Sequence, residues 1–225
     1  MSAPTIKLYT NHGCPSLKEL GLPYEEEIID LAVPRTEEYL RINPRGLVPT
    51  ISYDGTIITE SAIVSQFLAD VHPSHLVPAS GTKEGALLRA RINFFVDTYI
   101  SKVNALFFKL FRANTAEEAN ELAGNFVDTV AKEIEPLLVD ATPYFGGSDR
   151  PTLAEVMTGS FIIRLFSLAS HDMFPKSIID SLSDKATHFY AWAKAVIDTP
   201  SVNYIYDEDV IVAWAKKNMP RLQSV

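Results

Sequence analysis

The only cysteine of the chain, Cys14, is the side chain best suited to nucleophilic chemistry. It lies in the stretch TNHGCPSLKELGLPYEEE, between a predicted strand and a predicted helix, and Pro15 follows it. A thiol at the first turn of a helix faces unpaired backbone N–H groups and the positive end of the helix dipole, which lower its pKa. Proline suits the first helical position, where no N–H is needed. We therefore expect Cys14 to be a reactive thiolate, and the alternative is a buried, inert side chain.

The stretch NPRGLVPTI, residues 43–51, predicts a turn followed by an apolar strand that begins at Val48-Pro49. Proline at the start of a strand lacks the donor for the hydrogen-bond ladder and can be cis. In that case the N–H and C=O of Val48 would face outward and could pair with an extended peptide. The alternative is a strand that simply begins after a turn.

The stretch TESAIVSQ, residues 59–66, places Glu60 and Ser61 between a predicted strand and a predicted helix. Ser61 suits the N-cap, and the exposed N–H groups of a helix start can hold a carboxylate. Glu60 could receive an amine. Together the two residues could hold the head group of an amino acid, whereas capping alone is the alternative.

The elements that must position these residues form an α/β unit followed by a helical one. Before residue 75 the pattern is strand, helix, strand, helix, hairpin and helix, with Asp54-Gly55 as a strong hairpin signal. Apolar residues at helical spacing dominate from residue 83 onward. We predict an N-terminal domain with a mixed four-stranded sheet over residues 1–75, a linker over 76–82 and an all-α domain over 83–225.

Composition limits the class of protein and its partners. The chain has 225 residues, 47% of them hydrophobic, with a net charge of −8, which is typical of a soluble globular protein. The charge disfavours nucleic acid or an anionic membrane as the main partner. One cysteine excludes an internal disulfide and favours a reducing compartment, so any redox cycle needs an external thiol. We find no signal peptide, no apolar run of about 18 residues and no metal-binding motif.

A reactive thiol, a peptide-pairing edge and an amino-acid clamp in one α/β unit describe a glutathione site. The stretches NPRGLVPTI and ITESAIVSQFLAD resemble the most specific segments of cytosolic glutathione transferases, and the resemblance covers nearly the whole chain. It implies a thioredoxin-like domain that binds glutathione at Val48, Pro49, Glu60 and Ser61.

The Cys14-Pro15 pair resembles the omega-class, cysteine-type enzymes of this family. That resemblance implies a mixed disulfide between Cys14 and glutathione, with thioltransferase, dehydroascorbate reductase or deglutathionylation activity. Tyr9 and Ser16 are rival activators of the glutathione sulfur. The alternatives are a conjugating transferase that acts on electrophiles and a non-enzymatic glutathione-binding regulatory module.

The resemblance also implies further contacts. Arg35 resembles the basic residue that reaches the glycine carboxylate of glutathione, although a solvated surface arginine is an equal alternative. Arg164, a charge inside an apolar helical run, needs a partner or a cleft. The resemblance places it in the pocket for a small electrophile or disulfide, which Phe161 and Trp214 would line, although core packing is the alternative for Trp214. A cytoplasmic homodimer is implied.

Two further stretches are assigned to folding. Thr152 and Glu155 form the T-x-x-E pattern of a capping box, which resembles the buried capping box of the family. The helix after Pro15 is roughly seven residues, about two turns, shorter than the omega-like pattern. A helix this short would leave a sheet face uncovered, so we expect that the natural chain contains further residues and that the structure breaks between Pro15 and Ser16. Ser16 would then lie far along the helix.

Overall fold

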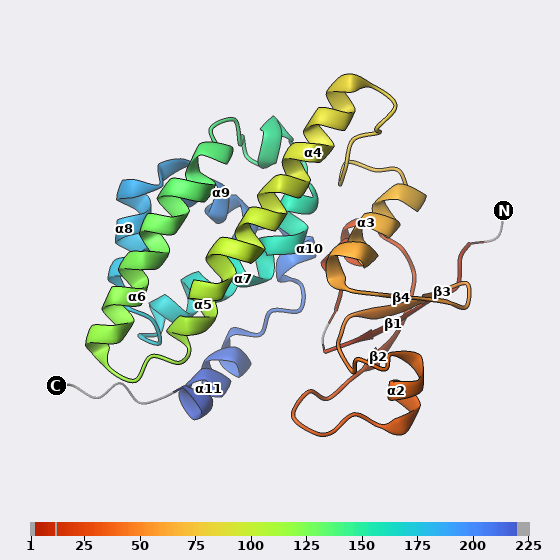
Figure 1. The fold of residues 1–225 in the computed structure, drawn as a ribbon, viewed down its shortest axis with the longest axis horizontal. Coiled ribbons are helices and arrows are strands. Elements are labelled where there is room, and N and C mark those ends of the chain that lie inside the picture. The colour runs from red at the N-terminus through yellow and green to blue at the C-terminus, as the bar shows by residue number, and fades with distance from the viewer. Residues whose placement is uncertain (1–2, 12, 220–225) are drawn as a thin grey trace. The chain divides into compact units, whose positions relative to one another are not determined.

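The computed structural model describes residues 3–11 and 13–219, which divide into two compact units at Val77 and Pro78. The N-terminal unit holds a mixed four-stranded sheet in the order β2-β1-β3-β4 (Figure 1). β1 pairs in parallel with β2 and antiparallel with β3, which pairs antiparallel with β4. The predicted α/β and all-α fold class is confirmed. The strands are β1 (Ile6–Thr10), β2 (Glu25–Ile28), β3 (Thr50–Tyr53) and β4 (Thr56–Thr59).

The central strand β1 is buried on both faces of the sheet. Ile6 and Leu8, two residues apart, face one side and pack in a cluster that includes Ile51 and Cys14. Tyr9 faces the other side and packs with Ile29 and Tyr39. Lys7, between Ile6 and Leu8, lies on this second face and is half-buried, and its ammonium pairs with the Glu27 carboxylate at 2.7 Å.

The turn between β3 and β4 follows the predicted hairpin. Asp54 and Gly55 both have positive φ angles, 49° and 84°, as the two central residues of a type I′ turn require. The Asp54 carboxylate also accepts a hydrogen bond from the Thr5 N–H at 2.8 Å, which ties the turn to the residue before β1. This hairpin signal is therefore confirmed.

Three helices flank the sheet: α1 (Pro15–Glu19), α2 (Glu37–Ile42) and α3 (Ser61–Val71). α3 packs on β3, β4 and α1 and buries Val64 and Leu68 (Figure 1). α2 buries Tyr39 against the opposite face, and the Thr36 hydroxyl caps it by accepting a hydrogen bond from the Tyr39 N–H.

The expected break after Pro15 is not observed, and this prediction is wrong. Pro15 and Ser16 are consecutive residues of α1, and the Lys18 N–H donates to the Cys14 C=O at 3.1 Å. Although α1 has only five residues, the sheet face is covered because other apolar side chains replace the missing turns. Leu17 is fully buried, and the partly buried side chains that pack against the same cluster are Leu20, Leu22, Tyr24, Tyr53, Ile58 and Phe67.

The C-terminal unit is helical. α7 is its core helix and contacts α4, α9 and α10. The α-helices are α4 (Lys83–Thr98), α5 (Asn104–Leu110), α6 (Ala116–Thr129), α7 (Leu153–Ser170), α8 (Ser177–Lys185), α9 (Thr187–Ile197), α10 (Pro200–Asn203) and α11 (Glu208–Asn218), with π-helical turns at Tyr99–Val103 and Val130–Ile134 and 3₁₀ turns at Glu135–Leu137 and Phe145–Gly147.

The start of α7 confirms the predicted capping box. The Thr152 hydroxyl accepts a hydrogen bond from the Ala154 N–H, and the Glu155 carboxylate accepts one from the Thr152 N–H at 2.7 Å. Contrary to our reading of the sequence, α7 is long and apolar enough to cross a membrane by length and composition. However, 67% of it is buried inside the protein, as in the core helix of a globular fold.

Candidate active site

One end of the sheet brings the three predicted site segments together. In the sheet register, Tyr9 pairs with Thr50, and Thr50 pairs with Thr59. The turn to Cys14 follows β1, Val48-Pro49 precedes β3 and Glu60-Ser61 follows β4. All three segments therefore leave the sheet at the same end, because β3 runs antiparallel to both of its neighbours.

Cys14 occupies the N-cap of α1, with Pro15 at the first helical position as predicted. Its side chain, however, is only 6% exposed and packs with Leu8, Leu17 and Val64 in the core cluster of the unit. Burial raises the pKa of the thiol. Hydrogen bonds from the Leu17 and Ser16 N–H groups and from the Ser16 hydroxyl oppose this rise, but burial prevails. The prediction of a lowered pKa is wrong, because it considered the helix start without the burial around it.

The turn that leads to Cys14 is held by side chains from β1 and β2. The Thr10 hydroxyl donates to the Gly13 C=O at 3.0 Å, and the Gly13 N–H donates to the Glu26 carboxylate at 2.8 Å. Asn11 donates from its amide to the Ile29 C=O at 3.0 Å. The negative charge of Glu26 adds to the rise of the Cys14 pKa. His12 lies outside the described residues.

The two rival activators lie on opposite faces of the sheet. Ser16 lies in the first turn of α1, beside Cys14, and not far along a longer helix as expected. Its hydroxyl is within 2.7 Å of the Ser65 hydroxyl, and the side chain is 1% exposed. Tyr9 is buried against Tyr39, with its ring centroid 5.7 Å from that ring.

The Val48–Pro49 peptide bond is cis. The backbone N–H and C=O of Val48 make no hydrogen bond with the part of the chain that the structure describes, so they are available to an extended ligand. Two side chains hold the preceding residue, because the Asn43 amide and the Tyr39 hydroxyl both donate to the Leu47 C=O, at 2.9 and 2.5 Å. Sequence reasoning treated Asn43 only as a turn residue, although Asn-Pro before a strand was the signal for it.

Glu60, rather than the predicted Ser61, is the N-cap of α3. Glu60 has a φ of 72° and makes no side-chain capping hydrogen bond, while Ser61 is the first helical residue and is exposed. No acidic residue lies in the first turn, so the first N–H groups of α3 lack a side-chain acceptor there. This helix start can accept a carboxylate.

The Glu60 carboxylate forms an ion pair with Arg45, whose side chain is 64% exposed. Glu60 is thus already paired with a cation of the protein, where the sequence analysis left it open for an amine. Arg45 was missed by sequence reasoning, although it stands in the same NPRG turn that suggested the peptide edge. The pair joins the turn before β3 to the start of α3.

Arg35 serves the loop between β2 and α2. Its Nε donates to the Gly46 C=O at 3.0 Å, and its Nη1 donates to the Asp30 and Val33 C=O groups at 2.7 and 2.6 Å. Arg35 is therefore not the solvated surface arginine of the alternative, because three backbone carbonyls hold it. A ligand carboxylate has Nη2 as its remaining donor group, which makes no hydrogen bond with the described residues.

The three residues predicted to contact a second substrate, Phe161, Arg164 and Trp214, all lie in the C-terminal unit. Phe161 and Arg164 are on α7, whereas Trp214 is on α11. Arg164 on α7 donates to the Ser160 C=O at 2.8 Å and lies over the Tyr206 ring at 5.9 Å. Burial lowers its pKa, and Tyr206 opposes this. Phe161 packs against Phe107, Phe108 and Tyr99, whereas Trp214 is 52% exposed and touches Phe111.

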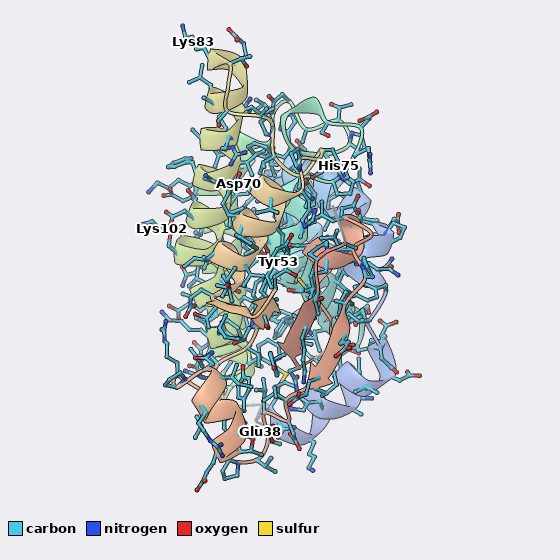
Figure 2. The ribbon with its side chains drawn as sticks, turned by 90° about the vertical axis from the view of Figure 1, so that its right-hand side faces the viewer. Glu38, Tyr53, Asp70, His75, Lys83 and Lys102 are labelled. Carbon is cyan, nitrogen blue, oxygen red and sulfur yellow. The ribbon has the colours of Figure 1, made fainter. Side chains whose placement is uncertain are left out.

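The remaining features are less suited to chemistry. Residues 204–209 line an open depression of about 540 Å³. His75 pairs with Glu19 at 2.7 Å and His72 contacts the Tyr53 hydroxyl at 3.0 Å. Figure 2 shows His75 toward one end of the N-terminal unit and Glu38 of α2 at the other, with Tyr53 between them. Across residues 3–11 and 13–219, no group of three or more His, Cys, Asp or Glu side chains could hold a metal ion.

Comparison with known proteins identifies the family. The profile described as the glutathione S-transferase N-terminal domain matches residues 16–71. A probable maleylacetoacetate isomerase from Caenorhabditis elegans is 30% identical over 161 residues, which are 68% of this chain and 74% of that protein. The chain belongs to the glutathione S-transferase family. The profile match begins two residues after Cys14, so the role of the cysteine depends on the geometry of this chain.

Two solved glutathione transferase structures share the fold over almost the whole chain. Omega 3C from Trametes versicolor is 25% identical with a TM-score of 0.73, covering 95% of this chain and 91% of that one. Rice GST1, solved with glutathione, is 22% identical with a TM-score of 0.78, covering 96% and 99%. The chain aligns with only 53%, 30% and 60% of the lengths of three further curated relatives. These comparisons establish the family and the fold of the chain, and its activity and substrates are proposed below.

Proposed function

We propose that this glutathione S-transferase family member is a glutathione-dependent transferase of the omega-like type, in which Cys14 forms a mixed disulfide with glutathione. One observation carries the proposal. The sheet register places the Cys14 helix start, the free backbone of Val48 and the start of α3 at one end of the sheet. A tripeptide thiol that lies along Val48 and reaches the start of α3 has Cys14 beside its path.

Each part of glutathione has a matching group. The Val48 N–H and C=O, beside Pro49, pair with the backbone of the central cysteine. The first N–H groups of α3, at Ser61, hold the γ-glutamyl carboxylate, and Glu60 receives the amine in exchange for part of its contact with Arg45. Arg35 offers Nη2 to the glycine carboxylate.

The reaction is a pair of thiol–disulfide exchanges. The Cys14 thiolate attacks the glutathione sulfur of a mixed disulfide between glutathione and a substrate thiol, forms a Cys14–glutathione disulfide and releases the substrate as its thiolate. A second glutathione thiolate then attacks this disulfide, releases oxidised glutathione and restores the Cys14 thiolate. In sum, the mixed disulfide and one reduced glutathione give the free substrate thiol and oxidised glutathione, so one disulfide bond is exchanged for another. Because the Cys14 pKa is raised, the resting thiol must lose its proton before the first step.

A conjugating transferase is the second candidate, and the burial of Cys14 favours it. A sulfur that is 6% exposed and protonated at neutral pH is a poor nucleophile until it is uncovered. In this alternative the glutathione sulfur itself attacks a small electrophile, and no covalent bond to the protein forms. Glutathione would bind with the same contacts.

The adduct on Cys14 distinguishes the two candidates. The protein is incubated with oxidised glutathione, and its intact mass is measured. We expect a gain of one glutathione that is absent in Cys14→Ser and that reduced glutathione removes. The control is Ser201→Ala, in the C-terminal unit, which should keep the adduct.

Two other outcomes of these measurements would contradict the proposed thioltransferase function. If wild type and Cys14→Ser conjugate an aromatic electrophile at equal rates and neither forms the adduct, the conjugating function replaces the thioltransferase function. If calorimetry shows no binding of glutathione to either protein, both candidates fail and a non-enzymatic role remains.

The proposal extends to the surroundings of the reaction. The second substrate is a small electrophile or disulfide, with Phe161, Arg164 and Trp214 as candidate contacts. A net charge of −8 and a lone cysteine support a cytoplasmic protein that binds neither nucleic acid nor membrane and uses no metal. A homodimer is part of the same proposal.

A further inference from the structure

Two buried serine hydroxyls connect the helix that begins at Cys14 to α3. The Ser16 hydroxyl in the first turn of α1 lies 2.7 Å from the Ser65 hydroxyl in the second turn of α3. The two residues are 1% and 4% exposed, so solvent does not compete for these groups. A buried hydroxyl requires a partner, and each serine supplies one for the other.

The Ser16 hydroxyl has a second acceptor nearby, because Ser16 lies in the first turn of the helix that Cys14 caps, where its hydroxyl favours the thiolate form of the sulfur. A hydroxyl carries one proton and can donate it to one of the two acceptors at a time. While the thiol is neutral, Ser16 donates to Ser65. When the sulfur carries a charge, a charge-assisted bond to it is the stronger choice. Ser16 then donates to the sulfur, and Ser65 turns its own proton toward the Ser16 oxygen.

We propose that Ser16 and Ser65 are positioning residues that stabilise the Cys14 thiolate by reorienting as a pair when the sulfur ionises. No proton is transferred and no covalent bond changes; two hydroxyl groups rotate. The assignment of Cys14 as the reacting thiol rests on the proposed function, whereas the response of the serine pair to ionisation does not.

The groups around the Cys14 sulfur mostly oppose its ionisation, so the side chains that favour the thiolate matter. Leu8, Leu17 and Val64 close around Cys14, and burial raises its pKa. The negative charge of the Glu26 carboxylate on β2 also opposes ionisation of the sulfur. The backbone N–H groups of Ser16 and Leu17 and the Ser16 hydroxyl favour the thiolate. Ser16 is thus the side chain in this set that a substitution can remove without changing the backbone.

A titration of the sulfur tests the pair without any substrate. The chain has one cysteine, so protein labelled with ¹³C at the cysteine β-carbon gives a single NMR signal that shifts as Cys14 ionises. The apparent pKa is measured for wild type, Ser16→Ala, Ser65→Ala, the double variant and Ser65→Thr. Ser201→Ala serves as the matched control, because Ser201, in the C-terminal unit, is a buried serine whose hydroxyl has no hydrogen-bond partner among the residues that the structure describes.

We expect Ser16→Ala to raise the apparent pKa by about one unit, since one charge-assisted hydrogen bond is lost. Ser65→Ala should raise it by a smaller amount, Ser65→Thr should restore the wild-type value and Ser201→Ala should leave it unchanged. The double variant should titrate as Ser16→Ala does, because Ser65 acts through Ser16.

Two results would overturn the proposal: no shift in Ser65→Ala, or a double variant whose shift is the sum of the two single shifts. If Ser16→Ala fails to fold, the comparison of Ser65→Ala with Ser65→Thr still decides. The titration is independent of the glutathione adduct. The proposed function can therefore fail while the serine pair is upheld, and the reverse also holds.

Discussion

At the scale of single residues, the environment of Cys14 decides its chemistry more than its position in the chain does. The N-cap position and the following proline are those of a reactive cysteine, and the backbone N–H groups of Ser16 and Leu17 favour the thiolate. Burial nevertheless outweighs them, because taking a thiolate out of water costs more than two neutral hydrogen bonds return. Cys14 is therefore a protected thiol at neutral pH, and chemistry at this site requires both exposure and loss of a proton.

This balance predicts slow and alkaline-shifted labelling of Cys14. At pH 7, iodoacetamide should react with the folded protein at least about tenfold more slowly than with free glutathione, because the thiolate is scarce and buried. The rate should rise with pH beyond the range of an ordinary thiol and approach the rate of a free thiol in urea. The measurement is intact mass against time at several pH values. A folded-state rate at pH 7 that exceeds the glutathione rate would contradict the raised pKa.

At the scale of elements, the T-x-x-E pattern correctly predicted the start of α7, and the structure shows further contacts of Glu155 with residues distant in the sequence. The capping box of α7 follows directly from T-x-x-E, yet the Glu155 carboxylate also accepts hydrogen bonds from the Trp192 indole at 2.5 Å and from the Phe145 N–H at 2.8 Å. Glu155 is fully buried, and burial raises its pKa although four hydrogen bonds oppose the rise. One carboxylate thus joins the start of α7 to α9 and to the 3₁₀ turn at Phe145–Gly147.

Substitution of Glu155 should reveal this junction. In Glu155→Gln the amide NH₂ faces donors that need an acceptor, so we expect the free energy of unfolding to fall by about 1–3 kcal/mol at pH 7. Because the folded pKa of Glu155 is raised, its contribution to stability is complete below the ordinary carboxyl pKa and declines as pH rises through the folded value. The cost of Glu155→Gln should therefore be larger at pH 4 than at pH 7.

The measurement is urea unfolding followed by tryptophan fluorescence, since both tryptophans lie in the C-terminal unit. The exposed Glu118, which accepts the Asn114 N–H at 2.8 Å near the start of α6, provides the matched control. Glu118→Gln should cost under about 1 kcal/mol. Equal losses for the two variants would mean that burial does not strengthen the Glu155 contacts.

At the scale of the whole molecule, the chain comprises two units that each carry their own buried core and their own polar junctions. The C-terminal unit has a second junction at Glu135, whose carboxylate accepts the His188 and Phe189 N–H groups at the start of α9, at 2.9 and 2.8 Å. It also pairs with the His188 ring at 2.6 Å. Burial opposes ionisation of Glu135, but these bonds prevail and lower its pKa.

The lowered pKa of Glu135 predicts acid sensitivity of the C-terminal unit. Its contribution to stability is complete above the ordinary carboxyl pKa of 4.5 and is lost as pH falls through the lower folded value. Glu135→Gln should lower the free energy of unfolding at pH 6 by about 1–2 kcal/mol and flatten its decline between pH 5 and pH 3. Urea unfolding at each pH measures this, with Glu133→Gln in the preceding π-helical turn as control. Parallel pH curves for wild type and Glu135→Gln would refute the assignment.

Across these scales, the sequence by itself determined the local features that depend on a few neighbouring residues, such as turns and helix starts. Asp54-Gly55 specifies its turn because of the φ angles it permits, and Thr152 with Glu155 specifies a helix start because the partners are three residues apart. The grouping of the Cys14, Val48 and Ser61 segments into one glutathione site came from their residue types and from the resemblance to glutathione transferases, and the strand order of the structure brings them to one end of the sheet. Such features depend on local geometry or on topology, both of which a pattern of residue types encodes.

Only the tertiary structure decided the features that depend on burial and on distant partners. The raised pKa of Cys14 comes from the apolar side chains of three different elements, and the Ser16 contact joins residues 49 positions apart. Arg35 proved to hold backbone carbonyls, and Glu60 proved to be paired with Arg45. The short α1 covers its face of the sheet with help from side chains beyond its end. Desolvation and competition among partners are set by three-dimensional packing, so no local pattern could reveal them.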